Sequence, residues 1–271
     1  MRRVHSLFYG SILVAAWGAL SFVTASERLL LKESFEEPNL CFNPRGEKPC
    51  SEHLRSQGDR VVVVKEEGWE PRPLDGLQCV RASISYNPDG SSYRSELSLS
   101  NHRNRGNLKK RLISSREIWV EFSIYLPTDY ESDPIREIVS QWLEDGENNQ
   151  AVALTTHEGE WRLETVQGQA DEEFPIINGK KILYRAPYQR ERWTNWKFHL
   201  IWSTKEDGLI EAWRDEEKVV SYRGANQYST KIFPYWKFGI YKSKWKNRGL
   251  NELSVRERRL YFDNLTVKIS P

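Results

Sequence analysis

Residues 117–126 read EIWVEFSIYL, and their alternation decides the fold class. Val120, Phe122, Ile124 and Leu126 stand at every second position and are all apolar. Because successive side chains of a β-strand point to opposite sides, these four residues can share the core face of a sheet. The stretch therefore predicts a β-strand with one buried face and one polar face.

Similar strand-like runs follow one another along the rest of the chain. They include RVVVVKEE at 60–67, CVRASISY at 79–86 and WTNWKFHLIWS at 193–203. Aromatic residues make up 12% of the sequence and only one methionine is present, a composition that favours strands over helices. About a dozen strands with turn signals between them predict an all-β fold, namely a two-sheet antiparallel β-sandwich of the β-jelly-roll, concanavalin-like kind.

Two local features refine this expectation. Asn178-Gly179 and Asp207-Gly208 have the composition of turns between strands. Residues 134–145, PIREIVSQWLED, are the one stretch for which a short helix is an alternative to a strand.

The first 25 residues have the pattern of a secretory signal peptide. Arg2 and Arg3 precede an apolar run that ends in small residues, which predicts cleavage after Ala25. A membrane anchor is the alternative for an apolar run of this length. Residues 26–271 would then form a single domain that is secreted or periplasmic and makes no membrane contact after cleavage.

The charge balance narrows the class of partner. Without Arg2 and Arg3 the 40 basic residues fall to 38, which equals the 38 acidic residues. A nearly neutral chain is not typical of a general nucleic-acid binder. We expect a monomer with no nucleic-acid partner.

The three cysteines predict one disulfide and one free thiol. Cys41 and Cys50 flank a loop rich in turn formers, and a disulfide between them is expected in an exported chain. Cys79 has a strand-like position and is expected to be a buried free thiol rather than a nucleophile. The sequence contains no CxxC pair or HExxH motif, so a zinc site is not expected.

Residues 235–241, YWKFGIY, carry an unusual polar face. Trp236, Phe238 and Ile240 form an ordinary core face. The opposite face carries Tyr235, Lys237, Gly239 and Tyr241. It places a cation between two phenols, with a glycine that leaves room above the backbone. The simpler alternative is a solvated strand on which the lysine stem covers apolar surface.

Two other strands carry related chemistry. Arg94 and Glu96 lie two apart in YRSELSLS, so they can pair on one face and present a guanidinium to a ligand carboxylate. Gln141 is a neutral donor in EIVSQWL. Its neighbours at every second position are apolar, so alternation alone does not place it in a groove.

The polar face of the strand at 117–126 contains Trp119 and Tyr125. Aromatic and polar groups on one sheet face can floor a sugar-binding groove in a jelly roll, and we predict that both residues contact a saccharide. A solvated sheet face is the alternative.

The ordered set of motifs resembles the jelly-roll polysaccharide lyases. Arg-Ser-Glu-Leu at 94–97, the central Gln141 and Tyr-x-Lys-x-Gly-x-Tyr at 235–241 occur in the same order in alginate lyases, glucuronan lyases and heparin lyase I-like enzymes. The second half, up to YFDNLTV at 261–267, looks most like the heparin lyase I and glucuronan lyase side. The resemblance covers most of residues 29–269.

The resemblance implies an enzyme that cleaves an acidic, uronate-containing polysaccharide, most similar to glucuronan, by β-elimination. Such an enzyme removes the proton on C5, stabilises the enolate-like state and protonates the leaving O4. Tyr241 is implied as the acid. Arg94, Gln141 and Lys237 are implied as catalytic partners of the substrate carboxylate, with Glu96 and Tyr235 as further substrate contacts.

The base is less clearly specified. Many relatives carry a histidine two residues after the glutamine, where this chain has Leu143. Either Tyr241 performs both proton transfers, or a histidine comes from elsewhere, for which His102 in the loop SNHRNRG is the candidate. His157 and His199 are less suited by position.

Similar sandwiches hold a structural calcium ion through an acidic residue near the first strand and another on the last. Glu36 and Asp263 are the corresponding residues here, and calcium would be the only cofactor. The alternative is a surface glutamate and an aspartate that accepts hydrogen bonds from its own turn.

Two other functions remain open on the sequence. A non-catalytic carbohydrate-binding protein of the same fold would fit the missing histidine. A glycoside hydrolase needs two carboxylates on one strand, and Glu117 and Glu121 have such a spacing.

Overall fold

A computed structural model describes residues 27–36, 54–57, 61–68, 70–88, 93–99, 115–144, 150–169, 176–228 and 233–270. The predicted signal peptide 1–25, the predicted pair Cys41 and Cys50, and His102 lie outside these residues. Among the described residues no helix is long and apolar enough to cross a membrane.

The described chain forms fifteen β-strands and two short 3-10 helices. In chain order they are β1 (Arg28–Glu33), β2 (Leu54–Gln57), β3 (Val61–Lys65), β4 (Gln78–Ser85), β5 (Arg94–Leu99), β6 (Glu117–Tyr125), β7 (Glu137–Leu143), β8 (Gln150–His157), β9 (Glu160–Gln169), β10 (Ile176–Pro187), β11 (Trp193–Ile201), β12 (Leu209–Arg214), β13 (Glu217–Arg223), β14 (Tyr235–Tyr241), η1 (Ser243–Asn247), η2 (Leu250–Glu252) and β15 (Glu257–Ile269).

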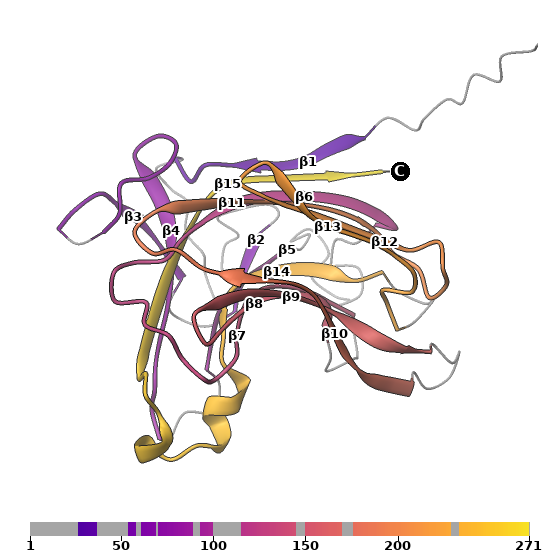
Figure 1. Ribbon diagram of the computed structural model, residues 1–271. Helices are drawn as coiled ribbons and strands as arrows, with labels where there is room; N and C mark the ends of the chain where they lie inside the picture. Colours follow the sequence, from indigo (N-terminus) through magenta and orange to yellow (C-terminus); the bar gives the residue numbers. More distant parts are fainter. Residues whose placement is uncertain are drawn as a thin grey trace, which may run out of the picture.

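The strands form two antiparallel sheets that stack face to face, which confirms the predicted two-sheet β-sandwich. The eight-stranded sheet has the order β13-β12-β11-β6-β15-β4-β3, and β1 pairs with β15. The seven-stranded sheet has the order β10-β9-β8-β7-β14-β5-β2. Figure 1 shows β6, β11, β12 and β15 in one layer and β7, β8, β9 and β14 in the other.

The core lies between the sheets and follows from the alternation of the strands. Phe122 from β6 packs against Trp236 from β14, with ring centroids 5.5 Å apart, and Phe238 packs against Phe262 of β15 at 4.9 Å. All four side chains are at most 1% exposed. Each strand therefore has one face committed to the core, and its other face remains for function or solvent.

The structure decides three local predictions, for the turn at Asn178-Gly179, the possible helix at 134–145 and the thiol of Cys79. Asn178-Gly179 is not a turn but lies inside β10, where the register against β9 shifts between Ile177 and Gly179, so a bulge accommodates the turn-like residues. Residues 134–145, for which a short helix was the alternative, contain strand β7. Cys79 is free and fully buried, as predicted, and burial raises the pKa of its thiol to about 12.

Candidate active site

Strand β14 lies between β5 and β7 in the seven-stranded sheet, and this position brings the sequence motifs together. Tyr241 pairs with Arg94, and Gly239 pairs with Glu96. On the other side Lys237 pairs with Gln141. Directly paired residues of antiparallel strands point to the same face, so all these side chains share the sheet face that points away from the core.

The polar side chains form one connected cluster, which we call the Arg94 cluster: Arg94, Glu96, Gln141, Lys237 and Tyr241. Arg94 Nε lies 3.1 Å from Glu96 Oε2, and Gln141 Nε2 donates a hydrogen bond to Glu96 Oε1. The guanidinium carbon of Arg94 lies 4.1 Å from the centroid of the Tyr241 ring. The structure thus brings the five predicted residues together on one face.

The cluster has a buried floor and a more exposed rim. Glu96, Gln141 and Lys237 are at most 3% exposed, whereas Arg94 and Tyr241 are partly exposed. Lys237 also lies over the ring of Tyr235, with its Nζ 5.3 Å from the centroid. A ligand on this face would meet the Arg94 guanidinium and the Tyr241 phenol.

Burial shifts the two charges on the floor toward their neutral forms. It raises the pKa of Glu96, although Lys237, Arg94 and Gln141 oppose this change. Burial also lowers the pKa of Lys237, an effect that Glu96 opposes and Arg94 reinforces. The floor therefore holds charges whose ionisation depends on their neighbours, which is typical of functional sites.

Gln141 presents an unsatisfied acceptor to this face. Its amide nitrogen must face the carboxylate of Glu96, which fixes the orientation of the amide. Its Oε1 is buried and accepts no hydrogen bond from the described residues. A buried acceptor without a donor is costly, so the position suits the hydroxyl of a ligand or water.

A β-bulge explains why alternation did not predict the position of Gln141. The register of β7 shifts between Ile138 and Ser140 against β8. As a result Val139, Ser140 and Trp142 all lie toward the core, where Ser140 accepts a hydrogen bond from the Trp236 indole. Gln141 then falls on the outer face although its neighbours at every second position are apolar.

Gly239 allows the close approach of β5 to β14. Its φ is +136°, and a Cβ at this position would lie 2.1 Å from Ser95 O and 2.6 Å from Glu96 Cα. Any side chain would therefore displace the strand that carries Arg94 and Glu96.

We expect Gly239→Ala to destabilise the protein by at least about 2 kcal/mol, because it combines backbone strain with a clash against backbone atoms. Gly68→Ala is the matched control. Gly68 also has a positive φ, of +61°, but a Cβ added to it would meet no atom within 4 Å, so only about 1 kcal/mol is expected. Urea unfolding curves of both variants measure the difference, and equal losses would contradict the role of the close approach.

A second charged cluster lies on the same sheet face. The register row through Lys237 and Gln141 continues through Ala153 to Glu164 of β9. Arg136 holds Glu164 with Nη2 and Oε2 2.7 Å apart, and Lys180 Nζ lies 3.7 Å away from the same oxygen.

The second cluster is net positive. Burial works against the ionisation of Glu164, but Arg136 and Lys180 outweigh it and hold its pKa below the usual range. Burial, followed by the repulsion of Arg136, lowers the pKa of Lys180 to about 8. Two cations thus face one carboxylate. Three strand spacings of about 4.8 Å separate Glu164 from Lys237, which places the second cluster about 14 Å from Lys237.

A buried ionic network supports the end of β14. Lys242, next to Tyr241, places Nζ 2.7 Å from Asp133 Oδ2 and 3.4 Å from Glu137 Oε2. Arg258 of β15 donates to Glu137 Oε2 at 3.1 Å, and its guanidinium carbon lies 4.2 Å from the Tyr130 ring centroid. These five side chains are at most 4% exposed. Two cations balance two carboxylates, as buried charges require.

The structure corrects the predicted placement of Trp119 and Tyr125. Both belong to β6 in the other, eight-stranded sheet, and both lie on its outer face. Trp119 stacks on His199 with centroids 3.8 Å apart, and Tyr125 packs against Trp193. Alternation assigns a residue to one of two faces but not to a sheet, so these aromatics do not lie on the sheet face of the Arg94 cluster.

The carboxylates of Glu36 and Asp263 bind the backbone at the two ends of the segment 74–78. Asp263 Oδ2 accepts hydrogen bonds from the backbone N–H groups of Leu74 and Asp75, and Glu36 Oε1 accepts those of Leu77 and Gln78. Burial raises the pKa of Asp263 to about 6. N–H donors point at these oxygens, and no group of three or more possible metal ligands occurs among the described residues.

The described histidines do not lie beside Tyr241. His199 is on the outer face of the other sheet, between Glu117 and Glu211 at 2.8 and 3.1 Å. His157 ends β8, two strands away from β14, with its Nδ1 3.0 Å from Glu158. The contact with His199 also engages Glu117, one of the two carboxylates considered for a hydrolase.

Two hollows formed by described residues lie elsewhere. One, of about 510 Å³, is on the outer face of the eight-stranded sheet, and one of about 240 Å³ lies near β4 and β15. Neither is lined by a residue of the Arg94 cluster. We place the candidate active site by its connected charged groups, because these and not the size of a hollow can perform proton transfer.

The two-sheet fold is that of the jelly-roll polysaccharide lyases. The family model of the polysaccharide lyases matches residues 69–266, which is more than half of the 271 residues. The chain therefore belongs to this family and is a polysaccharide lyase.

A solved lyase structure shows the same fold. An endo-β-1,4-glucuronan lyase from the fungus Trichoderma reesei has a TM-score of 0.59 at 14% identity, covering 80% of this chain and 90% of that chain. Two alginate lyases are less similar. The one from Aplysia kurodai has a TM-score of 0.49 at 11% identity, covering 73% of this chain and 85% of that chain. The one from Pseudomonas aeruginosa has a TM-score of 0.44 at 16% identity, covering 82% and 87%. No curated protein sequence matches the chain.

Proposed function

We propose that this polysaccharide lyase cleaves a glucuronan-like polyuronate by β-elimination at the Arg94 cluster. The observation that carries the proposal is the convergence of Arg94, Glu96, Gln141, Lys237 and Tyr241 on one sheet face. It supplies cations for a carboxylate and a phenol for proton transfer within one set of contacts. No carboxylate pair of the hydrolase kind belongs to it.

The residues match the steps of the elimination. A base takes the C5 proton, the electron pair forms the C4–C5 double bond, and the C4–O4 bond breaks as the leaving oxygen receives a proton. The negative charge moves onto the substrate carboxylate in the transition state, so cations placed beside it lower the barrier. Arg94 and Lys237 take this role, and Glu96 holds Arg94 in place.

Tyr241 is the proposed acid, and it is also the proposed base. The guanidinium carbon of Arg94 lies 4.1 Å from the centroid of the Tyr241 ring, so the cation and the phenol can act on the same sugar unit. His102 is the alternative base and lies outside the described residues. At 143, where many relatives carry a histidine, Leu143 pairs with Tyr235 and has no group that could accept a proton.

The charge of the sheet face supports a polyanionic substrate. The cluster of Arg136, Glu164 and Lys180 has a net positive charge and shares a register row with Lys237. A polymer that runs across the strands would meet cations at both places, whereas a neutral polysaccharide would gain nothing from them.

The proposal is tested by absorbance in the far ultraviolet. The protein is incubated separately with glucuronan, alginate, heparin and hyaluronan, since elimination leaves an absorbing double bond conjugated to the carboxylate and hydrolysis does not. We expect the largest rate with glucuronan. A faster rate with another polymer would overturn the substrate assignment, and no rise with any acidic polymer would overturn the site assignment.

We expect Lys237→Met to lower kcat/KM by about 10²–10³-fold, as the loss of one charge-stabilising group in a transition state does elsewhere. The rate of the absorbance rise on glucuronan measures it. Lys205→Met, in an exposed loop of the other sheet, is the control and should stay within about twofold of the parent protein. A similar activity of the two variants would remove Lys237 from the mechanism.

A structural calcium ion at Glu36 and Asp263 is a separate part of the proposal. We expect calcium to raise the melting temperature of the parent protein and to leave that of Asp263→Ala unchanged, because a ligand stabilises only the state that binds it. Thermal unfolding with calcium and with a chelator measures the effect. An equal shift of the melting temperature in both proteins would mean that these carboxylates do not bind calcium and serve only to hold the loop.

Export, a Cys41–Cys50 disulfide and a monomeric state complete the proposal. Mass spectrometry of the mature protein from an exporting host, without and with reductant, tests the cleavage after Ala25 and the disulfide. Light scattering tests the monomer.

A further inference from the structure

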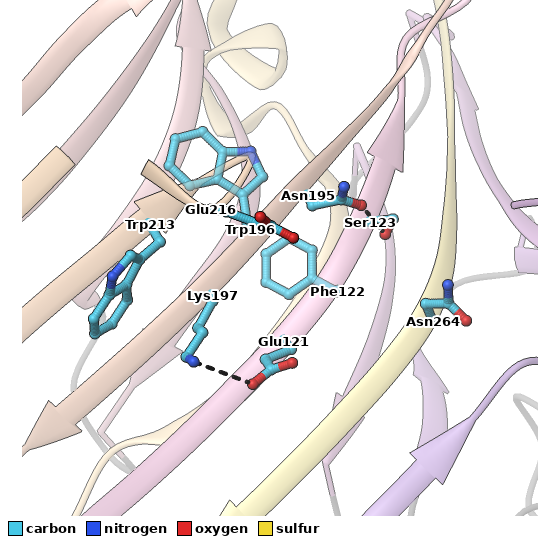
Figure 2. Close-up of a pocket in the computed structure, with 9 residues that line it drawn as sticks. All are labelled: Glu121, Phe122, Ser123, Asn195, Trp196, Lys197, Trp213, Glu216 and Asn264. Carbon is cyan, nitrogen blue, oxygen red and sulfur yellow. Dashed lines mark hydrogen bonds and ion pairs between the residues drawn. The ribbon is translucent and has the colours of Figure 1, made fainter. Parts of the chain in front are cut away.

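The hollow of about 510 Å³ lies on the outer face of the eight-stranded sheet, on the opposite side of the sandwich from the Arg94 cluster. Figure 2 shows that its side chains come from β6, β11, β15 and the β12–β13 hairpin. It is lined by Glu121, Phe122, Ser123, Asn195, Trp196, Lys197, Trp213, Glu216 and Asn264. The volume is within the range of small-molecule sites, about 300–1,000 Å³.

The lining combines one aromatic wall with neutral polar groups. Trp213 is half-buried, and Lys197 Nζ and Lys218 Nζ lie 5.2 and 4.8 Å from its ring centroid. Ser123 donates to Asn195 Oδ1 at 2.6 Å, which turns the amide nitrogen of Asn195 away from that bond. An aromatic side chain beside amide and hydroxyl groups is the chemistry that suits a saccharide.

Two polar groups at the hollow are unpaired within the part of the chain that the structure describes. The side chains of Glu216 and Asn264 make no hydrogen bond or ion pair with any described residue, and Figure 2 draws none for them. Both residues also have left-handed backbone conformations, with φ of +69° and +51°. For Glu216 this is the conformation that a two-residue hairpin turn requires, and asparagine adopts it more readily than most residues.

The surrounding structure holds Glu216 in this conformation. It is the second residue of a two-residue turn whose first residue, Asp215, also has a positive φ of +48°. Asp215 accepts hydrogen bonds from the backbone N–H of Asn195 at 2.9 Å and from Arg192 Nη2 at 2.8 Å. The backbone that carries the Glu216 carboxylate is therefore fixed before any ligand binds.

The charges of the hollow indicate a neutral ligand. Glu121 and Glu216 supply two carboxylates. The ammonium of Lys197 lies 3.9 Å from Glu121, and that of Lys218, which lies over Trp213, is 2.6 Å from Glu211, so both cations are already paired. A uronate carboxylate would be repelled by Glu216, whereas a sugar hydroxyl can donate to it. The active-site face shows the opposite balance.

We propose that this hollow is a second carbohydrate site that binds uncharged saccharide units. It lies on the other sheet from the Arg94 cluster, so one sugar cannot occupy both sites. It would hold the enzyme on a neutral polysaccharide while the seven-stranded sheet acts on a polyuronate, and the local concentration of substrate would rise through this linkage.

Isothermal titration calorimetry with neutral hexasaccharides tests the proposal without any need for turnover. Cello-, xylo- and mannohexaose are titrated into the parent protein, Trp213→Ala and Glu216→Gln. We expect at least one hexaose to bind and Trp213→Ala to weaken it by about tenfold or more, as the loss of an aromatic anchor does. Glu216→Gln keeps the shape of the side chain and is expected to weaken binding as well, so the test does not depend on the tryptophan variant alone.

Arg185→Ala, exposed on β10 of the other sheet, is the matched control and should bind as the parent protein does. The proposal is overturned if no neutral hexaose binds with a Kd below about 10 mM. It is also overturned if both variants bind like the parent, or if a glucuronan hexamer binds more tightly than the neutral hexaoses and Trp213→Ala abolishes that binding. Elimination activity stays a separate readout, so the two proposals can fail independently.

Discussion

Tyr241→Phe is expected to lose at least about 10³-fold in kcat, because it removes the hydroxyl that we propose gives and takes the proton, and general acid–base groups contribute about 10²–10⁴-fold. The ring stays beneath the Arg94 guanidinium, so the fold and the binding of the polymer should be kept. The initial rate of the absorbance rise on glucuronan measures the loss.

Tyr125→Phe is the control for this experiment. Tyr125 lies on the outer face of the other sheet, where its ring packs against Trp193 and Tyr261. The rate of elimination by the Tyr125→Phe variant should stay within about twofold of that of the parent protein. An equal loss in both tyrosine variants would contradict the assignment of the active site to the seven-stranded sheet.

Lys242→Met is expected to destabilise the protein by about 3–5 kcal/mol, because it leaves a buried carboxylate without its cation. Asp133 and Glu137 would then share Arg258 alone, in a region where no side chain of the network is more than 4% exposed. Urea unfolding measures the free energy of unfolding.

The comparison variant is Arg116→Gln. Arg116 pairs with Asp207 at 2.9 Å, but both side chains are more than half exposed, and pairs this exposed contribute little to stability. A loss from Lys242→Met that is no larger than that of Arg116→Gln would show that the network contributes little to stability. A double variant, Lys242→Met with Asp133→Asn, should recover part of the loss, because it removes one of the unpaired charges.

Alternation was sufficient to predict the faces of the strands that carry the site. It placed Arg94 with Glu96 and Lys237 with Tyr241, and the order of these motifs along the chain pointed to the polysaccharide lyases before any contact was known. Phe122 and its neighbours at every second position were likewise predicted to be in the core.

The remaining features depend on contacts between distant segments. Gln141 reaches the site through a bulge in β7, which no local pattern reveals. Trp119 and Tyr125 have the composition of a sugar-binding surface, but strand order assigns them to the other sheet. Asn178-Gly179 has the composition of a turn, yet strand β10 runs through it.

The buried network beneath Tyr241 has a consequence for how the enzyme loses activity on heating. Lys242 follows β14 of one sheet, and Arg258 belongs to β15 of the other, so Glu137 and Asp133 connect both layers at the end where the proposed acid lies. Local melting of β14 would expose charges that are paired across the sandwich. The temperature of half-inactivation should therefore coincide with that of global unfolding, and the site should be lost in the same cooperative step as the fold.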